Sequence, residues 1–206
     1  MPADLARVLE PFTAGKRLVV LASTHEGEER SLLERLPALL GRYGDAVVLL
    51  APRHRERFDD VWALLEKTGV PAARRSAGPP PSATRLLLLD THGELGGAFR
   101  FATAAFMGGT LVPVGGHNVV EPAAAGVPVV FGPHMENFRA EEALLREAGA
   151  AARVENADAA VDALRAWLAD PDEAKRCGQA GADAVAGARG ALEATLALLA
   201  DTHFLE

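Results

Sequence analysis

The sequence predicts a doubly wound α/β domain built on a Rossmann-like parallel sheet. Short apolar runs of strand length alternate with stretches of helical periodicity along the 206 residues. These runs lack the apolar–polar alternation of a half-exposed strand, so helices should cover both faces of the sheet. Strands that alternate with helices pair in parallel through right-handed crossovers. We therefore expect a single domain over residues 1–206.

Apolar runs and stop signals place the elements of the first half. Arg17–Ser23 (RLVVLAS) and Ala46–Ala51 (AVVLLA) are expected to be buried strands. Between them, Ser23 and Glu26 have capping-box spacing, which predicts one helix that carries Leu32–Leu40 and ends at the following glycines. The other expected elements are a weak helix at 3–14, a helix at 55–68, a short strand within 70–76, a surface loop at 78–82, a strand at 85–90 and a helix at 95–102.

The second half is expected to complete the sheet and then become helical. Three further apolar runs read as strands, and proline at a first helical position starts a helix at Pro171. The expected elements are strands at 104–107, 127–131 and 151–154, and helices beginning near Asn118 and spanning 139–148 and 157–169, one from Pro171, and a separate last helix at 190–200.

Composition excludes several classes of protein and of site. A net charge of −7 argues against nucleic acid as the main partner. No apolar run is long enough to cross a membrane. The single cysteine, Cys177, excludes internal disulfides and cysteine-based zinc motifs, and the dispersed histidines form no HxH or HxxxH pair. We expect no metal site and no cofactor.

Polar residues gather in the loops that follow the expected strands. In a doubly wound sheet, ligands bind in the crevice beyond the carboxyl ends of the strands. Five of the six histidines lie in such loops: His25, His54, His92, His117 and His134. This distribution predicts one ligand site at one edge of the sheet.

The stretch Gly108–Phe138 has the features of a phosphate-binding loop. It contains the glycine pairs Gly108-Gly109 and Gly115-Gly116, which let the backbone approach a ligand closely. Asn118 and Glu121 follow where a helix should begin, and a helix start presents free N–H groups and a positive dipole end. The alternative is a tight loop between two strands with no ligand.

Four polar residues of these loops each have a structural alternative to ligand binding. Arg53 could grip a phosphate with its guanidinium, or pair with Glu56 at the surface. Glu121 could accept hydrogen bonds from sugar hydroxyls, or only stabilise a helix start. Ser23 could contact a phosphate or cap a helix, and Glu94 could bind a ligand or begin one.

Four motifs occur in the order found in one known family. They are ASTHEGEE (22–29), APRHRERF (51–58), DTHGELG (90–96) and GGTLVPVGGHNVVEPAAAGVPVVFGPHMENF (108–138). Together they resemble the C-terminal half of the 3-deoxy-D-manno-octulosonic acid (Kdo) transferases of lipopolysaccharide assembly. Thr110 replaces the usual Ser, and Val119-Val120 replace the usual Pro-Leu, but Asn118 and Glu121 remain.

The resemblance implies that the chain is the C-terminal half of a GT-B glycosyltransferase and binds the donor CMP-Kdo. Carried over by motif, the CMP-binding positions are Pro52, Arg53, His92, Gly93, Glu94, Asn118, Val119, Val120 and Glu121. Ser23 and Thr24 would lie near the phosphate, with Gly115 and Gly116 as a further phosphate loop. The resemblance also implies an inverting, metal-independent transfer whose catalytic residues lie outside this chain.

A missing N-terminal domain is expected to supply the rest of the enzyme. It would bind the lipid A precursor (lipid IVA), provide a glutamate base and anchor the whole protein at the cytoplasmic face of the bacterial inner membrane. The present chain should then be soluble, bind CMP and transfer nothing alone, with residues 190–204 made to pack on the missing domain. The alternatives are half of a UDP-sugar-dependent GT-B transferase or epimerase, or a non-catalytic nucleotide-binding module.

Overall fold

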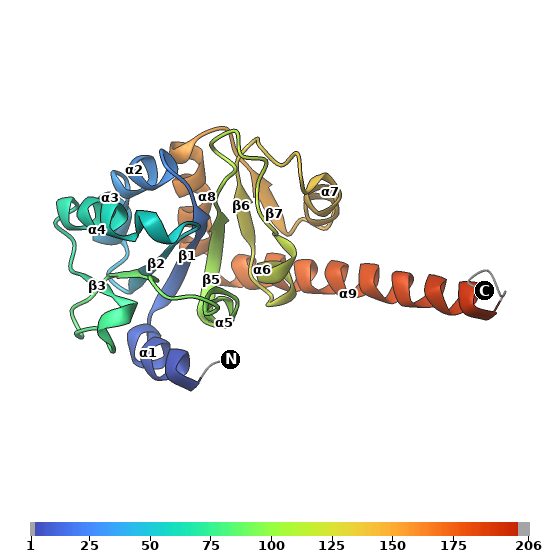
Figure 1. The fold of residues 1–206 in the computed structure, drawn as a ribbon, viewed down its shortest axis with the longest axis horizontal. Coiled ribbons are helices and arrows are strands. Elements are labelled where there is room, and N and C mark those ends of the chain that lie inside the picture. Colours follow the sequence, from blue (N-terminus) through green and yellow to red (C-terminus); the bar gives the residue numbers. More distant parts are fainter. Residues whose placement is uncertain (1–2, 202–206) are drawn as a thin grey trace.

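The chain folds around one parallel sheet of seven strands (Figure 1). The computed structural model describes the backbone of residues 3–201 and the side chains of residues 4–190. The strand order is β3-β4-β2-β1-β5-β6-β7, and every neighbouring pair is parallel. This confirms the predicted fold class. The strands are β1 (Arg17–Thr24), β2 (Ala46–Pro52), β3 (Ala72–Arg74), β4 (Leu86–Leu88), β5 (Ala102–Met107), β6 (Val129–Phe131) and β7 (Ala151–Arg153).

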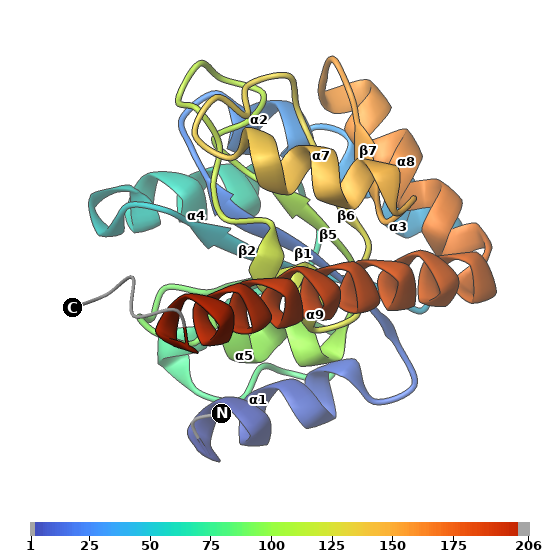
Figure 2. The same cartoon turned by 90° about the vertical axis from the view of Figure 1, so that its right-hand side faces the viewer.

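Helices cover both faces of this sheet. Figure 2 views one face with α9, α5 and α1 in the foreground. The helices that bury side chains on this face are α1 (Ala3–Thr13), α5 (Leu95–Ala98), α6 (Val120–Ala124), α7 (Arg139–Glu147) and the middle of α9 (Pro171–Asp201). The opposite face is covered by α2 (Glu28–Leu33), α3 (Leu36–Arg42), α4 (Phe58–Lys67) and α8 (Ala157–Ala169). Short 3-10 turns are η1 (Arg55–Arg57), η2 (Arg75–Ala77) and η3 (Phe99–Phe101).

Successive residues of the central strands enter different halves of the core. Leu18 and Val20 pack with the α1 side, whereas Val19 and Leu21 pack with the α2 side. Strand β2 is buried at each of its seven positions. The continuous apolar runs in the sequence follow directly from this double cover.

The predicted helix after β1 is wrong in two respects. Ser23 belongs to β1 and caps nothing, and the residue before α2 is Gly27, with φ 92° and no side-chain cap. The expected single helix is divided into α2 and α3. Pro37 lies in the first turn of α3, and proline has no N–H to continue hydrogen bonding from the preceding turn.

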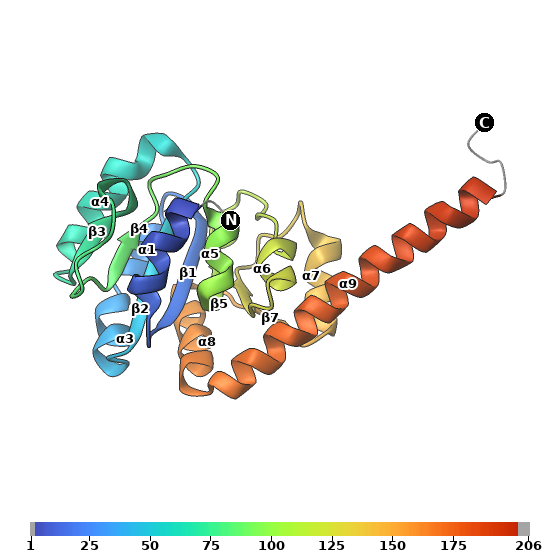
Figure 3. The same cartoon turned by 90° about the horizontal axis from the view of Figure 1, so that it is seen from below.

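The two helices expected after Pro171 are one continuous helix, α9. It contains glycines but no proline after its first residue, and glycine weakens a helix without breaking it. In Figures 1 and 3 its C-terminal half extends beyond the sheet. We expect residues 190–204 to pack on another domain. The side chains after residue 190 and the backbone after residue 201 lie outside the described part of the chain, so this stays a prediction. No helix in the described part of the chain is long and apolar enough to cross a bilayer.

The order of the strands places a crevice between β1 and β5. From β1 the chain adds β2, then β3 at the edge of the sheet and β4 between β3 and β2, and it then returns to add β5, β6 and β7 on the other side of β1. The loops after β1 and β5 therefore leave the sheet in opposite directions. In doubly wound folds this switch point is where ligands bind.

Candidate functional site

A cleft of about 470 Å³ opens at this switch point, beyond the carboxyl ends of the strands. A smaller pocket of about 120 Å³ adjoins it and shares Ser23, Arg53, Gly93 and Leu95 with it. The cleft is lined by Ser23, Arg53, Gly93, Leu95, Gly96, Phe99, Met107, His117, Asn118, Glu121 and Phe138. Of the predicted site residues, the two cavities bring together Ser23, Pro52, Arg53, His92, Gly93, Asn118 and Glu121.

Ser23 reaches the cleft through a local break in β1. The register with β2 slips between Ala22 and Thr24, and Ser23 has φ 50°, the one positive value among described non-glycine residues. Such a conformation costs a non-glycine residue of order 1 kcal/mol and occurs often at functional sites. Gly108, directly after β5, permits it, because a Cβ there would lie 2.4 Å from the carbonyl oxygen of Ser23.

Thr24 lies beneath the cleft and does not line it. Its side chain is buried, and its hydroxyl oxygen has no hydrogen-bond partner among the described residues. Its carbonyl oxygen accepts the N–H of Arg53 at 3.0 Å, which holds the start of the β2 loop against β1. The structure gives Thr24 a supporting position, and a phosphate contact by its side chain stays a prediction.

A buried carboxylate organises the glycine-rich loop after β5. Glu28 is 1% exposed and accepts the N–H groups of Gly109 (2.7 Å), Thr110 (3.0 Å) and Leu111 (2.9 Å). It also accepts the backbone N–H of His25 at 2.9 Å. These donors were expected to face a ligand phosphate, but an internal anion already occupies them. The sequence showed Glu28 only as an acidic residue in a first helical turn.

Thr110 joins this loop to the loop after β6. Its hydroxyl donates to the carbonyl oxygen of Met107 at 2.6 Å and accepts the N–H of Gly132 at 2.8 Å. Its own carbonyl oxygen accepts the N–H of His134 at 3.0 Å. Threonine keeps the hydroxyl of the serine found at this position in the resembling family, so the substitution preserves the link.

Gly115 and Gly116 are buried and hold the loop together from within. Their φ values are 96° and 83°, and a Cβ on Gly115 would lie 2.3 Å from the side chain of Asn137. The N–H of Gly116 donates to the carbonyl oxygen of Gly109 at 2.8 Å. These glycines do not line the cleft, and a phosphate contact by this internally bonded turn stays a prediction.

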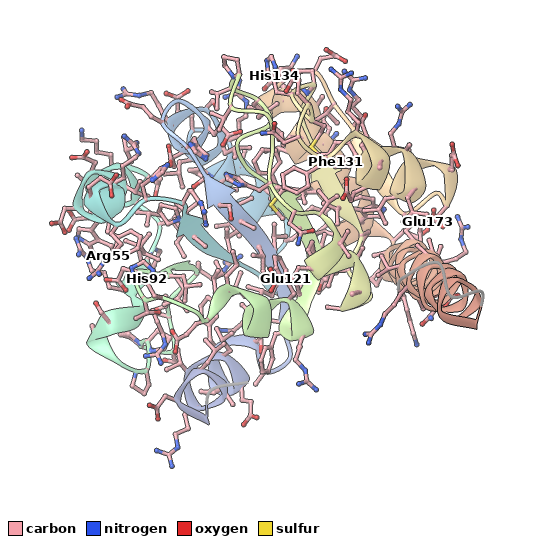
Figure 4. All side chains as sticks on the ribbon, turned by 45° about the vertical axis from the view of Figure 1, so that its right-hand side comes forward. Arg55, His92, Glu121, Phe131, His134 and Glu173 are labelled. Atoms are coloured by element: carbon pink, nitrogen blue, oxygen red, sulfur yellow. The ribbon has the colours of Figure 1, made fainter. Side chains whose placement is uncertain are left out.

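Arg53 and Glu121 are exposed on the lining of the cleft. Arg53 has no ion pair among the described side chains, and Glu56, the partner in its structural alternative, lies 3.7 Å from His54 instead. Glu121 closely approaches Gly96, where an added Cβ would lie 2.2 Å from Oε1. Figure 4 labels Glu121 on α6 and His92 in the loop after β4. The charged side chains of Arg53 and Glu121 are therefore available to a ligand.

The expected helix start near Asn118 is confirmed. Of the four residues from Asn118 to Glu121, two line the cleft and two do not. Asn118 Oδ1 accepts the N–H of Val120 at 2.9 Å, and α6 begins at Val120. Val119 is fully buried in the core and Val120 is half-buried, and neither lines the cleft. Only Asn118 and Glu121 of this run face the cavity.

Glu94 immediately precedes α5, as its structural alternative expected, but its side chain does not cap that helix. It is 7% exposed, and its carboxylate accepts hydrogen bonds from Arg75 at 2.8 Å and from the hydroxyl of Thr91. These bonds fix the loop that carries His92 and Gly93. Contact between Glu94 and a ligand stays a prediction.

Three histidines that are distant in sequence meet beside the cleft. His25 and His117 are hydrogen-bonded between their Nε2 atoms at 2.7 Å, and His54 lies edge-on to His25 with ring centroids 5.1 Å apart. Burial, followed by the neighbouring His25, Arg53 and His54, lowers the pKa of His117 to about 4. Burial also lowers the pKa of His25, followed by the effects of His54 and Arg53.

The other two loop histidines stand apart. The His92 ring centroid lies 6.1 Å from that of Phe58, and His134 Nδ1 lies 3.2 Å from Glu136. In the part of the chain that the structure describes, no three His, Cys, Asp or Glu side chains are arranged to hold a metal ion. Sequence position predicted that the histidines share an edge of the sheet, but not which of them touch.

Two known proteins with similar sequences carry the same name. The chain is 40% identical over 182 residues to a 3-deoxy-D-manno-octulosonic acid transferase of Haemophilus influenzae, and 38% identical over 192 residues to that of Bordetella pertussis. These matches cover 87% and 91% of the chain. No protein-family model matches the chain.

A solved structure matches it over almost the whole length of both chains. This is the C-terminal CMP-Kdo binding domain of WaaA from Acinetobacter baumannii, at 31% identity and a TM-score of 0.82. The match covers 88% of the present chain and 95% of that domain. The chain belongs to the Kdo transferase family.

Within the Kdo transferase family, the chain corresponds to one part of a longer protein. It covers 45% of the Bordetella pertussis transferase and 43% of the Haemophilus influenzae one, so it spans less than half the length of these relatives. A more distant structure, the C-terminal domain of the glycosyltransferase LpcC from Francisella tularensis, matches at 12% identity with a TM-score of 0.60. That likeness supports the fold alone, which is the GT-B half predicted from the motifs.

Proposed function

We propose that this chain is the donor-binding domain of a Kdo transferase and binds CMP-Kdo in the cleft between β1 and β5. One observation carries the proposal: Ser23, Arg53, Asn118 and Glu121, drawn from three motifs, line one cavity at the switch point of the sheet. The likeness to the CMP-Kdo binding domain from Acinetobacter baumannii supports the choice of ligand.

The charges along the cleft suggest a place for each part of the nucleotide. Arg53 is the only Lys or Arg among the described residues that line the cleft, and a guanidinium binds phosphate through paired hydrogen bonds. Glu121 would accept hydrogen bonds from ribose hydroxyls, as acidic residues do in dinucleotide folds. Ser23 would donate its hydroxyl to the phosphate, while Pro52, His92 and Gly93 would border the base-binding end.

The supply of hydrogen-bond donors favours a ligand with one phosphate. Glu28 already accepts the N–H groups of Gly109, Thr110 and Leu111, and the N–H of Gly116 is bonded to Gly109. A diphosphate would need more donors or a bridging cation to offset its charge. A nucleoside monophosphate donor such as CMP-Kdo therefore suits this cleft better than a UDP-sugar.

In the whole protein, we infer that this domain holds the donor while another domain positions the lipid A precursor (lipid IVA). A glutamate of that other domain would deprotonate the acceptor hydroxyl, which then attacks the anomeric carbon of Kdo as CMP departs. Arg53 would stabilise the charge that develops on the departing phosphate. We propose that the whole protein works at the cytoplasmic face of the inner membrane and that this chain alone transfers nothing.

Calorimetric titration of the chain with CMP, UDP and NAD tests the proposal. CMP should bind more tightly than the other two. Arg53→Ala and Glu121→Ala should each weaken CMP binding by about 1–3 kcal/mol, the range for hydrogen bonds to charged groups. Glu56→Ala, which removes an exposed carboxylate outside the cleft, is the matched control and should leave the affinity unchanged. A preference for UDP with no response to CMP would overturn the assignment.

A further inference from the structure

The hydrogen bond between His25 and His117 restricts how many protons the pair can carry. Because the two Nε2 atoms are 2.7 Å apart, one proton lies between them and the other nitrogen must accept it. A neutral pair, which carries two protons in all, can form this hydrogen bond. A third proton can be added at the free Nδ1 of the donating ring, and the bridge remains. A fourth would place protons on both facing Nε2 atoms and break the bridge, so the intact pair carries a charge of zero or +1.

The surroundings of the pair favour its neutral form. The charged and titratable groups that face it are Arg53, Arg57 and His54, all of which disfavour a further positive charge. The carboxylate of Glu28 is near, but it accepts the backbone N–H of His25 and not a ring N–H. Neither ring has a carboxylate partner among the described residues.

The pair is also held between two loops. His25 follows β1, His117 follows β5, and the planes of the two rings lie within 14° of parallel with their centroids 5.0 Å apart, as the Nε2–Nε2 hydrogen bond requires. Gly109 passes directly beneath them, where a Cβ would lie 3.0 Å from His117 Cδ2. His117 itself lines the cleft together with Arg53. A negative ligand group placed between these side chains would offset the positive charges that hold the pair neutral.

We propose that the His25–His117 pair takes up one proton from solvent when the phosphodiester of the donor binds, and so becomes a second cationic group of the site. This inference rests on the proposed function, since it assigns the phosphodiester to the same cleft. The added proton lies on a ring nitrogen, and no bond within the ligand is made or broken. The pair would act as a positioning group for the donor, in place of a second arginine or a cation.

The test is calorimetric titration with the methyl ester of CMP at pH 7. This probe is a phosphodiester, like the donor, and does not titrate near neutral pH, whereas the phosphate of CMP itself has a pKa of about 6. Titrations in buffers of different ionisation enthalpy report the number of protons taken up. We expect about 0.5–1 proton per bound ester, and an affinity that rises up to about tenfold per unit fall in pH between 8 and 6.

Variants separate the pair from the other histidines. His117→Gln and His25→Gln should abolish proton uptake and flatten the pH dependence of affinity, with folding checked by circular dichroism. His134→Gln, whose ring faces Glu136, should retain both. Binding of the ester by the native chain with no proton uptake would overturn this inference and leave the proposed function intact. Binding of UMP methyl ester but not of the CMP ester would overturn the proposed function, and absence of binding by either would overturn both.

Discussion

Replacement of Glu28 by glutamine should destabilise the fold strongly although it changes a single atom. Each carboxylate oxygen accepts two backbone N–H groups: Oε1 accepts those of Thr110 and Leu111, and Oε2 those of His25 and Gly109. Glutamine has one carbonyl oxygen, so its NH₂ group would face two buried donors. A buried donor without a partner costs about 1–3 kcal/mol, which gives a loss of about 2–6 kcal/mol in the free energy of unfolding.

Urea unfolding followed by circular dichroism would measure this loss. A domain of this kind has a total stability of about 5–15 kcal/mol, so the expected change is a large shift of the midpoint or failure to fold. Glu34→Gln is the matched control, because that carboxylate is 65% exposed and lies 3.9 Å from Arg35. An exposed pair contributes at most about 1 kcal/mol. If Glu28→Gln unfolds within about 0.5 kcal/mol of the native chain, the proposed role of Glu28 is incorrect.

Three further predictions concern the residues of the cleft. Ser23→Gly should raise the free energy of unfolding by about 1 kcal/mol in urea titrations, because glycine adopts the φ of 50° without strain; a loss of stability would contradict this. Gly96→Ala should weaken CMP binding at least about tenfold in calorimetry, since its Cβ would displace the carboxylate of Glu121, and unchanged affinity would remove Glu121 from the site. The free energy of unfolding should fall as the pH drops from about 6.5 toward 4, because the unfolded chain then binds a proton that His117, with a folded pKa of about 4, does not. His117→Gln should make this pH dependence shallower, and an identical slope would refute the assignment.

The sheet could be predicted because its signal is local. Val47 to Leu50 form a continuous apolar run, whereas a strand with one exposed face would alternate apolar and polar residues. The run is continuous because β2 is buried on both faces. The order of polar loops then followed from topology, since parallel strands present their carboxyl ends together. Arg53, Asn118 and Glu121 reach one cavity for that reason.

What the sequence did not reveal depends on contacts between distant residues. Glu28 and Thr110 are 82 positions apart, so nothing local distinguishes Glu28 from the exposed acidic residues around it. The contact between His25 and His117 spans 92 positions. The capping-box pattern of Ser23 and Glu26 is a short-range signal. It failed because β1 continues past Ser23 to Thr24, so no helix begins at Ser23.

The close seating of α9 against α6 has a mechanical consequence. At Gly178 an added Cβ would lie 1.9 Å from the carbonyl oxygen of Gly126, the residue that follows the α6 turn. The two backbones meet with no side chain between them to absorb displacement, and tightly packed contacts transmit movement. A displacement of α9 would therefore be passed to α6, the helix that carries Glu121 at the cleft.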